Sequence, residues 1–524
     1  METNRSPRKE ILLSSAALVL MTVLLKILGF GEKRVLTHFL GGGDDLDVFF
    51  AAFKISVVTY FVLRGILRPA VIPLLVRAKN ESPEKARNLG FSLALVTVLA
   101  IGGLTFAGEI FTPKLVSLFA EGFPAEKQLR CVQTTRWLLP ASIAMSLSQL
   151  LAISLQVQKR FVSAALGECI QKGAFIVAVA IWLIPFGPRG LAGACWTGCL
   201  CMFAYYVITH VGAFHLRGRL SFSGQGMVQT SHLAWPLVVG SLVSQAGRLV
   251  QNRFASTLDS GSVTALTLAQ TTVDLPLILV PLSLSIVLFP YFSEFSDRKE
   301  MERSFRYLSQ AARFLLITFA PVTVCAYLFR EPIAALLWKS GKLTEESIRL
   351  TSDALAGFVP GLPFMALEMV FMVYFYAHRR MVLAMVCGLV STGLALAFLP
   401  FMTQRFQLAG VSAFLPLARA VKIGLLIWCL RFLDARVPWG RCAVFLAKLA
   451  GAVLLALAVH GLVSIYLLPA VVFYQRYPLI ACAVSNTVLL GVYVVGLKLV
   501  GLREYAQIMD AIGKTFRRVS RESS

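Results

Sequence analysis

Apolar residues along this chain gather into runs of about 20 or more, separated by short polar stretches. A helix of about 20 residues crosses the roughly 30 Å hydrocarbon core of a bilayer, so each run predicts one membrane-spanning helix. Fourteen runs are found, at 11–30, 46–76, 88–111, 134–157, 161–183, 191–214, 233–255, 263–292, 307–328, 354–377, 381–402, 408–429, 444–468 and 479–500. The pattern therefore predicts an all-α polytopic membrane protein whose spans form groups of six, six and two.

Basic residues are shared unequally between the two sides of the predicted bundle. The two termini and the connections on their side hold 26 Lys and Arg residues, whereas the other connections hold 12. Because loops rich in Lys and Arg stay in the cytoplasm, both termini are expected to be cytoplasmic. An even number of spans places both termini on the same side of the membrane, in agreement with this result.

The composition agrees with a membrane protein and excludes soluble folds. The 524 residues are 57% hydrophobic and 15% charged, and the mean hydropathy is +0.74. A net charge of +23 would suggest nucleic acid in a soluble protein, but here anionic headgroups account for it, and no nucleic-acid partner is expected. The ten cysteines and six histidines show no metal-ligand spacing, so no metal or cofactor is expected.

Charges within the predicted spans carry the functional signal. A lone charge at the bilayer centre costs about 2.5 to 3.5 kcal/mol, so such residues should face protein or water. In the second span, Asp47, Lys54, Arg64 and Arg68 share an arc of about 100° if the helix is unbroken. The seventh span carries Gln245, Arg248, Asn252 and Arg253. Two interpretations stay open: a hydrated cationic cavity, or ion pairs that merely pack the bundle.

Short motifs in order along the chain carry a family resemblance. The first half holds Leu28-Gly29-Phe30, Gly41-Gly42-Gly43, Asp47, Phe49-Phe50 and Ala52-Phe53-Lys54. The second half holds Ser244-Gln245, Phe254-Ala255-Ser256, Ser260-Gly261-Ser262, Asp274-Leu275-Pro276 and Leu288-Phe289-Pro290. In these motifs the chain resembles the MurJ/MviN family of lipid II flippases, in the MOP flippase and exporter superfamily, over about the first twelve spans.

The resemblance implies an architecture and a substrate. The architecture is two pseudosymmetric six-helix lobes around a central cavity, 1–215 and 222–436, then two lipid-groove helices, 437–500, and a basic cytoplasmic tail, 501–524. The substrate is an undecaprenyl-diphosphate disaccharide-pentapeptide, lipid II, moved between leaflets of the bacterial cytoplasmic (inner) membrane by alternating access. Membrane lipids, and proteins of the cell-wall synthesis machinery, are the other partners that this function implies.

The resemblance also implies site residues, with departures from the family pattern. Asp47 and Lys54 match the family motif, and Lys26 stands where the family usually has arginine. At three other positions the family pattern expects arginine, but this chain has Glu32, Tyr60 and Thr271 there. We expect nearby cations to replace them, which gives a predicted substrate cavity of Lys26, Asp47, Lys54, Arg64, Arg68, Gln245, Arg248, Asn252, Arg253 and Asp274.

Other functions are weighed against this one. Export of a different polyprenyl-diphosphate oligosaccharide fits the same cationic cavity, whereas a cationic drug does not. A membrane glycosyltransferase needs catalytic carboxylates in a sizeable external segment, and the loops at 112–133 and 329–353 are short and lack such a motif. We therefore expect a transporter rather than an enzyme, and the polar second and seventh spans argue against a purely structural scaffold.

Overall fold

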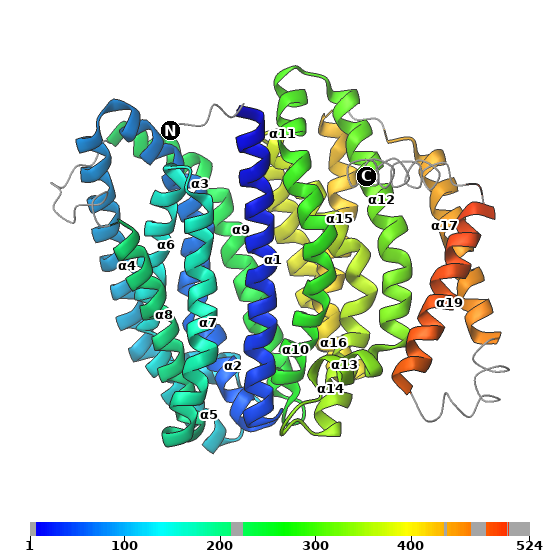
Figure 1. The fold of residues 1–524 in the computed structure, drawn as a ribbon, viewed down its shortest axis with the longest axis horizontal. Coiled ribbons are helices and arrows are strands. Elements are labelled where there is room, and N and C mark those ends of the chain that lie inside the picture. Colours follow the sequence, from blue (N-terminus) through cyan, green and yellow to red (C-terminus); the bar gives the residue numbers. More distant parts are fainter. Residues whose placement is uncertain (1–6, 211–223, 434–436, 463–477, 500, 502–524) are drawn as a thin grey trace, which may run out of the picture. The chain divides into compact units, whose positions relative to one another are not determined.

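The computed structural model describes residues 7–210, 224–433, 437–462, 478–499 and 501, and these are helical nearly throughout, with no strand among them (Figure 1). The chain forms two compact units, each made of several segments. Unit 1 comprises Met1–Leu275, Trp338–Ala354 and Gly388–Phe414, and unit 2 comprises Pro276–Leu337, Leu355–Cys387 and Leu415–Ser524.

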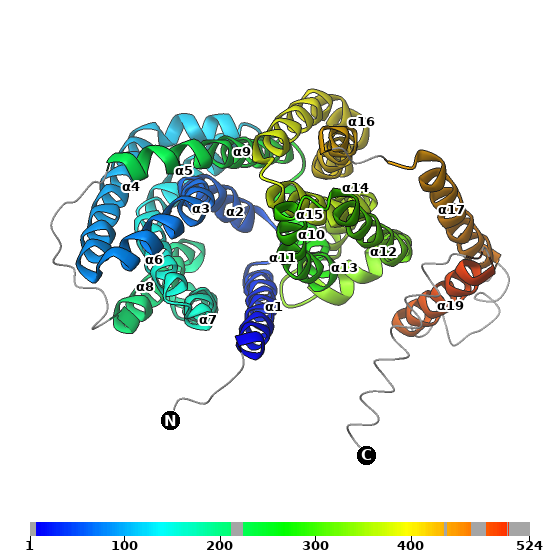
Figure 2. The same cartoon turned by 90° about the horizontal axis from the view of Figure 1, so that it is seen from above.

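Unit 1 consists mostly of the helices α1 to α10. Their bounds are α1 Pro7–Leu40, α2 Asp44–Ser56, α3 Val58–Glu81, α4 Pro83–Phe119, α5 Ala125–Leu138, α6 Ala141–Val157, α7 Phe161–Phe186, the 3-10 turn η1 Gly187–Arg189, α8 Gly190–His210, α9 Gly224–Ser256 and α10 Ser262–Leu277. In this unit α7 packs along α8 and α1, α3 packs on α9 and α6, and α2 packs on α5 (Figure 2).

Most of the remaining helices belong to unit 2, whereas α13, α14 and α16 have residues in both units. They are the π-helical turn η2 Ile278–Leu282, α11 Ser283–Asp297, α12 Met301–Leu328, α13 Arg330–Trp338, α14 Glu345–Phe358, η3 Val359–Gly361, α15 Leu362–Ala377, α16 Met381–Cys429, η4 Leu430–Leu433, α17 Trp439–Leu462 and α19 Pro478–Leu499. In unit 2, α17 and α19 pack on each other and on α12, where the Tyr493 hydroxyl donates to the carbonyl of Ile317 at 2.8 Å.

Wherever their residues are described, the predicted spans lie on these helices, which confirms the all-α membrane fold. Eight helical runs in the described part of the chain are long and apolar enough to cross a membrane. Two of them, Phe161–His210 and Met381–Leu433, each contain two predicted spans. The last residues of three predicted spans, 211–214, 463–468 and 500, lie outside the described residues. The partition into lobes at 1–215, 222–436 and 437–500 stays a prediction.

Local backbone chemistry sets the ends of several helices. Gly41, with φ of +77°, follows the last residue of α1 and adopts the left-handed conformation that glycine tolerates best. Ser82 caps α4, because its hydroxyl accepts a hydrogen bond from the amide of Lys85 at 3.1 Å. The very short turns predicted near Lys159 and His378 are confirmed, and Lys159 and Arg379 take positive φ values there.

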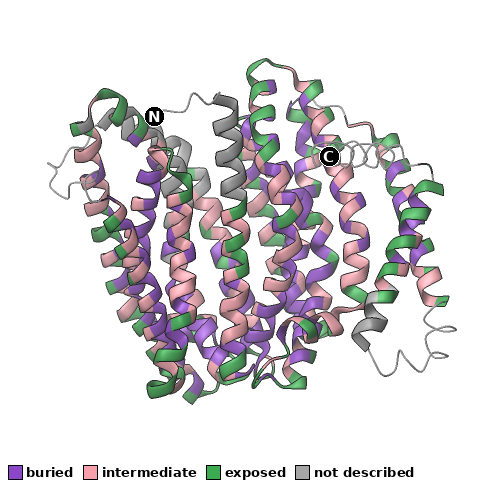
Figure 3. Ribbon diagram, in the orientation of Figure 1, coloured by how far each residue is buried: buried purple, intermediate pink, exposed green. Residues whose placement is uncertain are grey.

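The second predicted span is broken, which changes the arrangement of its charges. α2 ends at Ser56 and α3 begins at Val58, with Val57 outside helical geometry. The assumption of one unbroken polar stripe through Asp47, Lys54 and Arg64 is therefore wrong, because the break separates the first two residues from the third. Figure 3 shows α2 buried along most of its length, from Leu46 to Ser56.

The contact between α7 and α8 generates a stability prediction. A methyl group on Gly167 would lie 2.2 Å from the ring of Tyr206, which is 1% exposed, whereas one on Gly173 of the same helix meets nothing within 4 Å. We expect Gly167→Ala to destabilise the protein by about 1 to 3 kcal/mol through overpacking. Gly173→Ala should be neutral or stabilise it by up to about 1 kcal/mol, because alanine favours helix.

Thermal unfolding of both purified variants in detergent measures the difference. Equal melting temperatures for the two variants would contradict the packing described for Tyr206.

Candidate functional site

Asp47 lies in unit 1 where the start of α2 meets α5 and the start of α10, and both oxygens of its carboxylate accept hydrogen bonds. One oxygen accepts the Thr264 amide at 2.8 Å and the Thr264 hydroxyl at 2.7 Å. The other accepts the Gly261 amide at 2.8 Å and the Lys127 ammonium at 3.0 Å. Asp47 is 1% exposed, so these partners replace the water that a buried carboxylate would otherwise need. The first turn of α10 thus binds an anion in the way helix N-termini commonly do.

A second acid extends this arrangement, which we name the Asp47 junction: Asp44, Asp47, Lys127, Ser260, Gly261 and Thr264. Asp44 accepts hydrogen bonds from Lys127 and from the Ser260 hydroxyl, both at 2.6 Å. Partial burial opposes ionisation, but these hydrogen bonds and the charge of Lys127 hold the pKa of Asp44 below its usual value. The junction therefore joins the start of α2 to α5 and to the start of α10.

Backbones approach closely at the same place. A methyl group on Gly261, which has φ of +90°, would lie 2.5 Å from the carbonyl oxygen of Gly42. A methyl group on Gly122 would lie 2.3 Å from the carbonyl oxygen of Ser256. Small residues are therefore needed at both contacts, where these chain segments lie in close backbone contact.

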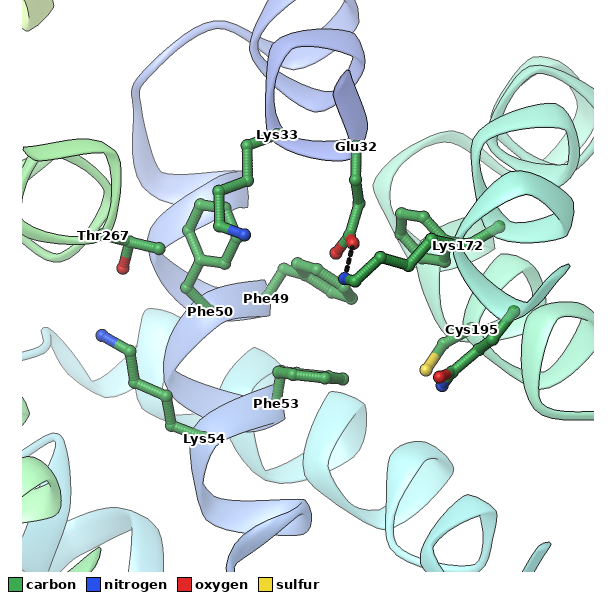
Figure 4. Close-up of a pocket in the computed structure, with 11 residues that line it drawn as sticks. Glu32, Lys33, Phe49, Phe50, Phe53, Lys54, Lys172, Cys195 and Thr267 are labelled. Carbon is green, nitrogen blue, oxygen red and sulfur yellow. Dashed lines mark hydrogen bonds and ion pairs between the residues drawn. The ribbon is translucent and has the colours of Figure 1, made fainter. Parts of the chain in front are cut away.

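A small cavity lies beside α2, and side chains from five helices line it (Figure 4). Its volume is about 190 Å³. The charged members are Glu32 and Lys33 of α1, Lys54 of α2 and Lys172 of α7. The others are Phe49, Phe50, Phe53, Gln171, Phe175, Cys195 and Thr267. Three lysines and one glutamate give this cavity a positive surplus.

One of the three lysines is held by the glutamate. Figure 4 shows Glu32 and Lys172 pointing toward each other, and their carboxylate oxygen and ammonium nitrogen are 2.5 Å apart. No acidic side chain within salt-bridge distance pairs with Lys33 or Lys54 among the described residues. Lys33 donates to the carbonyl of Gly29 at 3.3 Å, a neutral partner. The positive surplus is therefore carried by Lys33 and Lys54.

Lys54 also connects α2 to α9. Its ammonium donates to the side-chain oxygen of Asn252 at 3.2 Å, and the Asn252 amide donates to the carbonyl of Phe119 at 3.2 Å. Asn252 is fully buried, so its amide is oriented by these two contacts. Of the predicted site residues, Lys54 and Asn252 are thus in direct contact.

Two predicted arginines are instead paired with acids. Arg64 donates to Glu168 at 2.8 Å and to the hydroxyl of Tyr60 at 3.3 Å. Tyr60 stands at a position where the family pattern expects arginine, so the Arg64 guanidinium reaches back to that position from the next turn. Arg253 pairs with Glu121.

The other predicted residues have separate surroundings. Arg248 donates to the side-chain oxygen of Gln245 at 3.2 Å, and Gln245 is buried. Lys26 is exposed. Asp274 is half-buried and interacts electrostatically with Lys33. The side chain of Arg68 lies outside the described residues. Among the predicted residues whose side chains are described, Lys54 is the one that lines the cavity.

The sequence interpretation missed several residues of this region. Lys33 and Lys172 line the cavity, and Thr267 completes it from α10. The signal for the lysines was available, because Lys33 follows a departure from the family pattern and Lys172 is a cation within an apolar run. Lys127 had no such signal, since it occupies a polar connecting segment.

Unit 2 contains its own buried charge cluster. Glu368 of α15 pairs with Arg419, and with Lys422 at 2.7 Å, both from α16. Lys422 is 8% exposed and Glu368 is 9% exposed, so this carboxylate neutralises part of the positive charge inside the unit. Within the described residues no group of three or more His, Cys, Asp or Glu side chains could hold a metal ion.

Solved structures share this fold. A structure described as a lipid II flippase MurJ in an inward closed conformation matches with a TM-score of 0.74 at 18% identity, covering 92% of this chain and 98% of the other. An inward-facing multidrug resistance MATE transporter of the MOP superfamily matches with a TM-score of 0.67 at 15% identity, covering 80% and 98%. These likenesses show the fold.

Sequence comparison gives the family. The probable lipid II flippase MurJ of Buchnera aphidicola subsp. Schizaphis graminum is 25% identical over 427 residues, covering 80% of this chain and 83% of the relative. The lipid II flippase MurJ of Burkholderia cenocepacia is 22% identical over 378 residues, covering 68% and 72%. The family model described as lipid II flippase MurJ matches residues 36–480. This chain therefore belongs to the MurJ family of lipid II flippases.

Proposed function

We propose that this chain carries lipid II, an undecaprenyl-diphosphate disaccharide-pentapeptide, from the inner to the outer leaflet of the bacterial cytoplasmic membrane by alternating access. The family match over residues 36–480 is the observation that carries this proposal, and it makes the chain a transporter rather than an enzyme. The positive surplus of the cavity supports it, since a diphosphate crossing the membrane needs cations in place of water.

We infer that both termini are cytoplasmic, from the unequal shares of Lys and Arg on the two sides. The Asp47 junction, at the connection from α1 to α2, would then lie at the external end of unit 1. Its filled carboxylate and close backbone contacts support a role as the closed external gate in an inward-facing state. Opening this gate would expose Asp47 and Lys127 to water, which can replace their lost partners.

We infer that the diphosphate interacts with Lys33, Lys54 and Lys172. Glu32 compensates the charge of Lys172, and an entering diphosphate would compete with Glu32 for that ammonium. Lysine is a compact point charge and arginine is a planar fork, so these contacts would be less directional than those of the family arginines. Arg64, which pairs with Glu168, and Arg248 would be secondary contacts of the diphosphate. Lys26, Arg68, Gln245 and Arg253 would complete the polar lining of its path, and Asp274 would interact with Lys33 rather than with the anion. Contacts with cell-wall synthesis proteins would follow from the same function.

Replacement in living cells tests the function. A strain depleted of its own lipid II flippase would receive this gene, and outward lipid II would be measured by access of an external lipid II-cleaving enzyme. We expect outward lipid II to be restored. If the protein is inserted and stable but lipid II stays inward, another polyprenyl-diphosphate oligosaccharide becomes the better candidate for the cargo.

The lysine assignment gives a second prediction. Lys33→Gln combined with Lys54→Gln removes two positive charges while keeping most of each side-chain stem, so we expect outward lipid II to fall at least about tenfold. Lys85→Gln, at an exposed residue outside the cavity, is the matched control and should retain full transport. Wild-type transport by the double variant would rule out these lysines as substrate contacts.

The Glu32 to Lys172 ion pair gives a third prediction, tested by charge reversal. Glu32→Lys alone leaves two like charges together, so we expect loss of both thermal stability and transport. Adding Lys172→Glu restores an ion pair with reversed polarity and should recover most of the stability. Thermal unfolding of the two single variants and the double variant measures the coupling, and additive effects would argue against a specific pair.

The Asp47 junction gives a fourth prediction. Asp47→Ala removes all four hydrogen bonds to the carboxylate and breaks a buried ion pair, a loss of about 3 to 5 kcal/mol at this gate. A cysteine placed at Val263, which is fully buried, should then react with a membrane-impermeant maleimide added outside. Asp45→Ala, which removes one half-exposed ion pair to Arg130, should leave that cysteine protected. Equal labelling of the two variants would contradict the gate.

A further inference from the structure

A second and larger cavity lies in unit 1, among α2, α5, α7 and α8. Its volume is about 660 Å³, within the range of sites that bind small molecules. We name it the tryptophan cavity, because Trp137 of α5, Trp182 of α7 and Trp196 of α8 all line it. Phe49 lines both this cavity and the smaller one, but none of the cavity lysines does.

The polar atoms of two of these tryptophans are already satisfied within the protein. The Trp182 indole donates to the hydroxyl of Thr197 at 3.0 Å, and the Trp196 indole donates to the carbonyl of Trp137 at 2.9 Å. A methyl group on Gly193 would lie 2.7 Å from the Trp182 ring, so that ring is also held by close packing. The two rings are therefore fixed and offer apolar faces to the cavity rather than hydrogen-bond donors.

The rim of the cavity is apolar and exposed. Trp137 is 70% exposed, Phe186 is 58% exposed and Leu200 is 51% exposed, and all three line the cavity. On α7, Ile181 and Ile184 are exposed as well. In a membrane-spanning protein, exposed apolar side chains on long helices contact lipid chains. The geometry therefore opens this cavity to the bilayer.

Two arginines add the opposite chemistry to the cavity lining. Arg189 belongs to η1, the turn that joins α7 to α8, and Arg130 lies on α5. Arg130 pairs with Asp45, whereas Arg189 is exposed and has no acidic partner among the described residues. Asp45, Arg130 and Arg189 are the charged residues of the lining, so its net charge is positive. A turn between two spans lies at headgroup level, where tryptophan rings and arginines are both favoured.

We propose that the tryptophan cavity binds one anionic phospholipid of the surrounding bilayer. Its phosphate would contact Arg189, with Arg130 nearby, and an acyl chain would lie against Trp137, Trp182 and Leu200. The apolar walls and the opening to the bilayer favour a lipid over a free sugar or a free phosphate. The unpaired positive charge favours an anionic headgroup over a zwitterionic one. This site is separate from the lysines to which lipid II transport is assigned above.

Native mass spectrometry of the full-length protein in detergent tests this site. The protein would be titrated with phosphatidylglycerol or with phosphatidylethanolamine of the same acyl chains, and bound lipids counted. We expect one phosphatidylglycerol to be retained at least about tenfold more tightly than phosphatidylethanolamine. Equal retention of the two lipids would overturn the proposal.

Two variants locate the binding. Arg189→Gln is at an exposed turn and should fold normally, and we expect it to weaken phosphatidylglycerol binding about tenfold without changing phosphatidylethanolamine binding. Leu200→Trp places a larger side chain at the rim of the cavity and should weaken the binding of both lipids. Arg405→Gln, at an exposed arginine that does not line the cavity, is the matched control and should bind as the wild type does. Wild-type binding by Arg189→Gln would overturn the proposal.

A competition experiment separates this site from the transported lipid. If undecaprenyl diphosphate displaces the bound phosphatidylglycerol at lower concentration than phosphatidylglycerol itself does, the cavity belongs to the transport path and the proposal is wrong. If it does not, the phospholipid assignment stands. The result is independent of flipping, because Lys33→Gln with Lys54→Gln should still retain phosphatidylglycerol.

Discussion

Charge in a medium that cannot solvate it is the constraint on which the rest of this structure depends. Inside a bilayer every ionised side chain needs a protein partner, a water-filled space or a cargo of opposite sign. The described charges divide along these lines. Asp47 and Glu368 are surrounded by donors and cations, whereas Lys33 and Lys54 line a cavity and have no acidic side chain within salt-bridge distance in the described part of the chain. The second group marks where an anion can be accommodated.

The fold could be predicted from the sequence because its signal is long and repetitive. A run of 20 apolar residues has few alternatives to a spanning helix, and the short turns at Lys159 and Arg379 appeared where the runs were interrupted. The break at Val57 could not be predicted in this way. It lies within an apolar stretch with no glycine or proline, so the local sequence carries no signal for it.

The site was predicted less completely, for a physical reason. A sequence shows which spans carry charges but not which charges neutralise one another across helices. Arg64 and Arg253 were assigned to the cavity, yet Glu168 and Glu121 pair with them. Glu32 and Lys172 lie 140 positions apart, and their ion pair could be found only in three dimensions. Family motifs gave Lys54 and Asp47, but the motif does not distinguish a cavity residue from one that joins helix ends.

The choice of lysine at the cavity has a consequence for the range of cargo that such a protein can tolerate. A flexible ammonium follows its anion through several positions, while a guanidinium fork demands one orientation. A chamber that recognises charge more than shape would accept bacterial precursors whose peptide stems differ in composition. Selectivity among glycans would then have to reside in neutral contacts, such as the stacked rings of Phe49, Phe53 and Phe175.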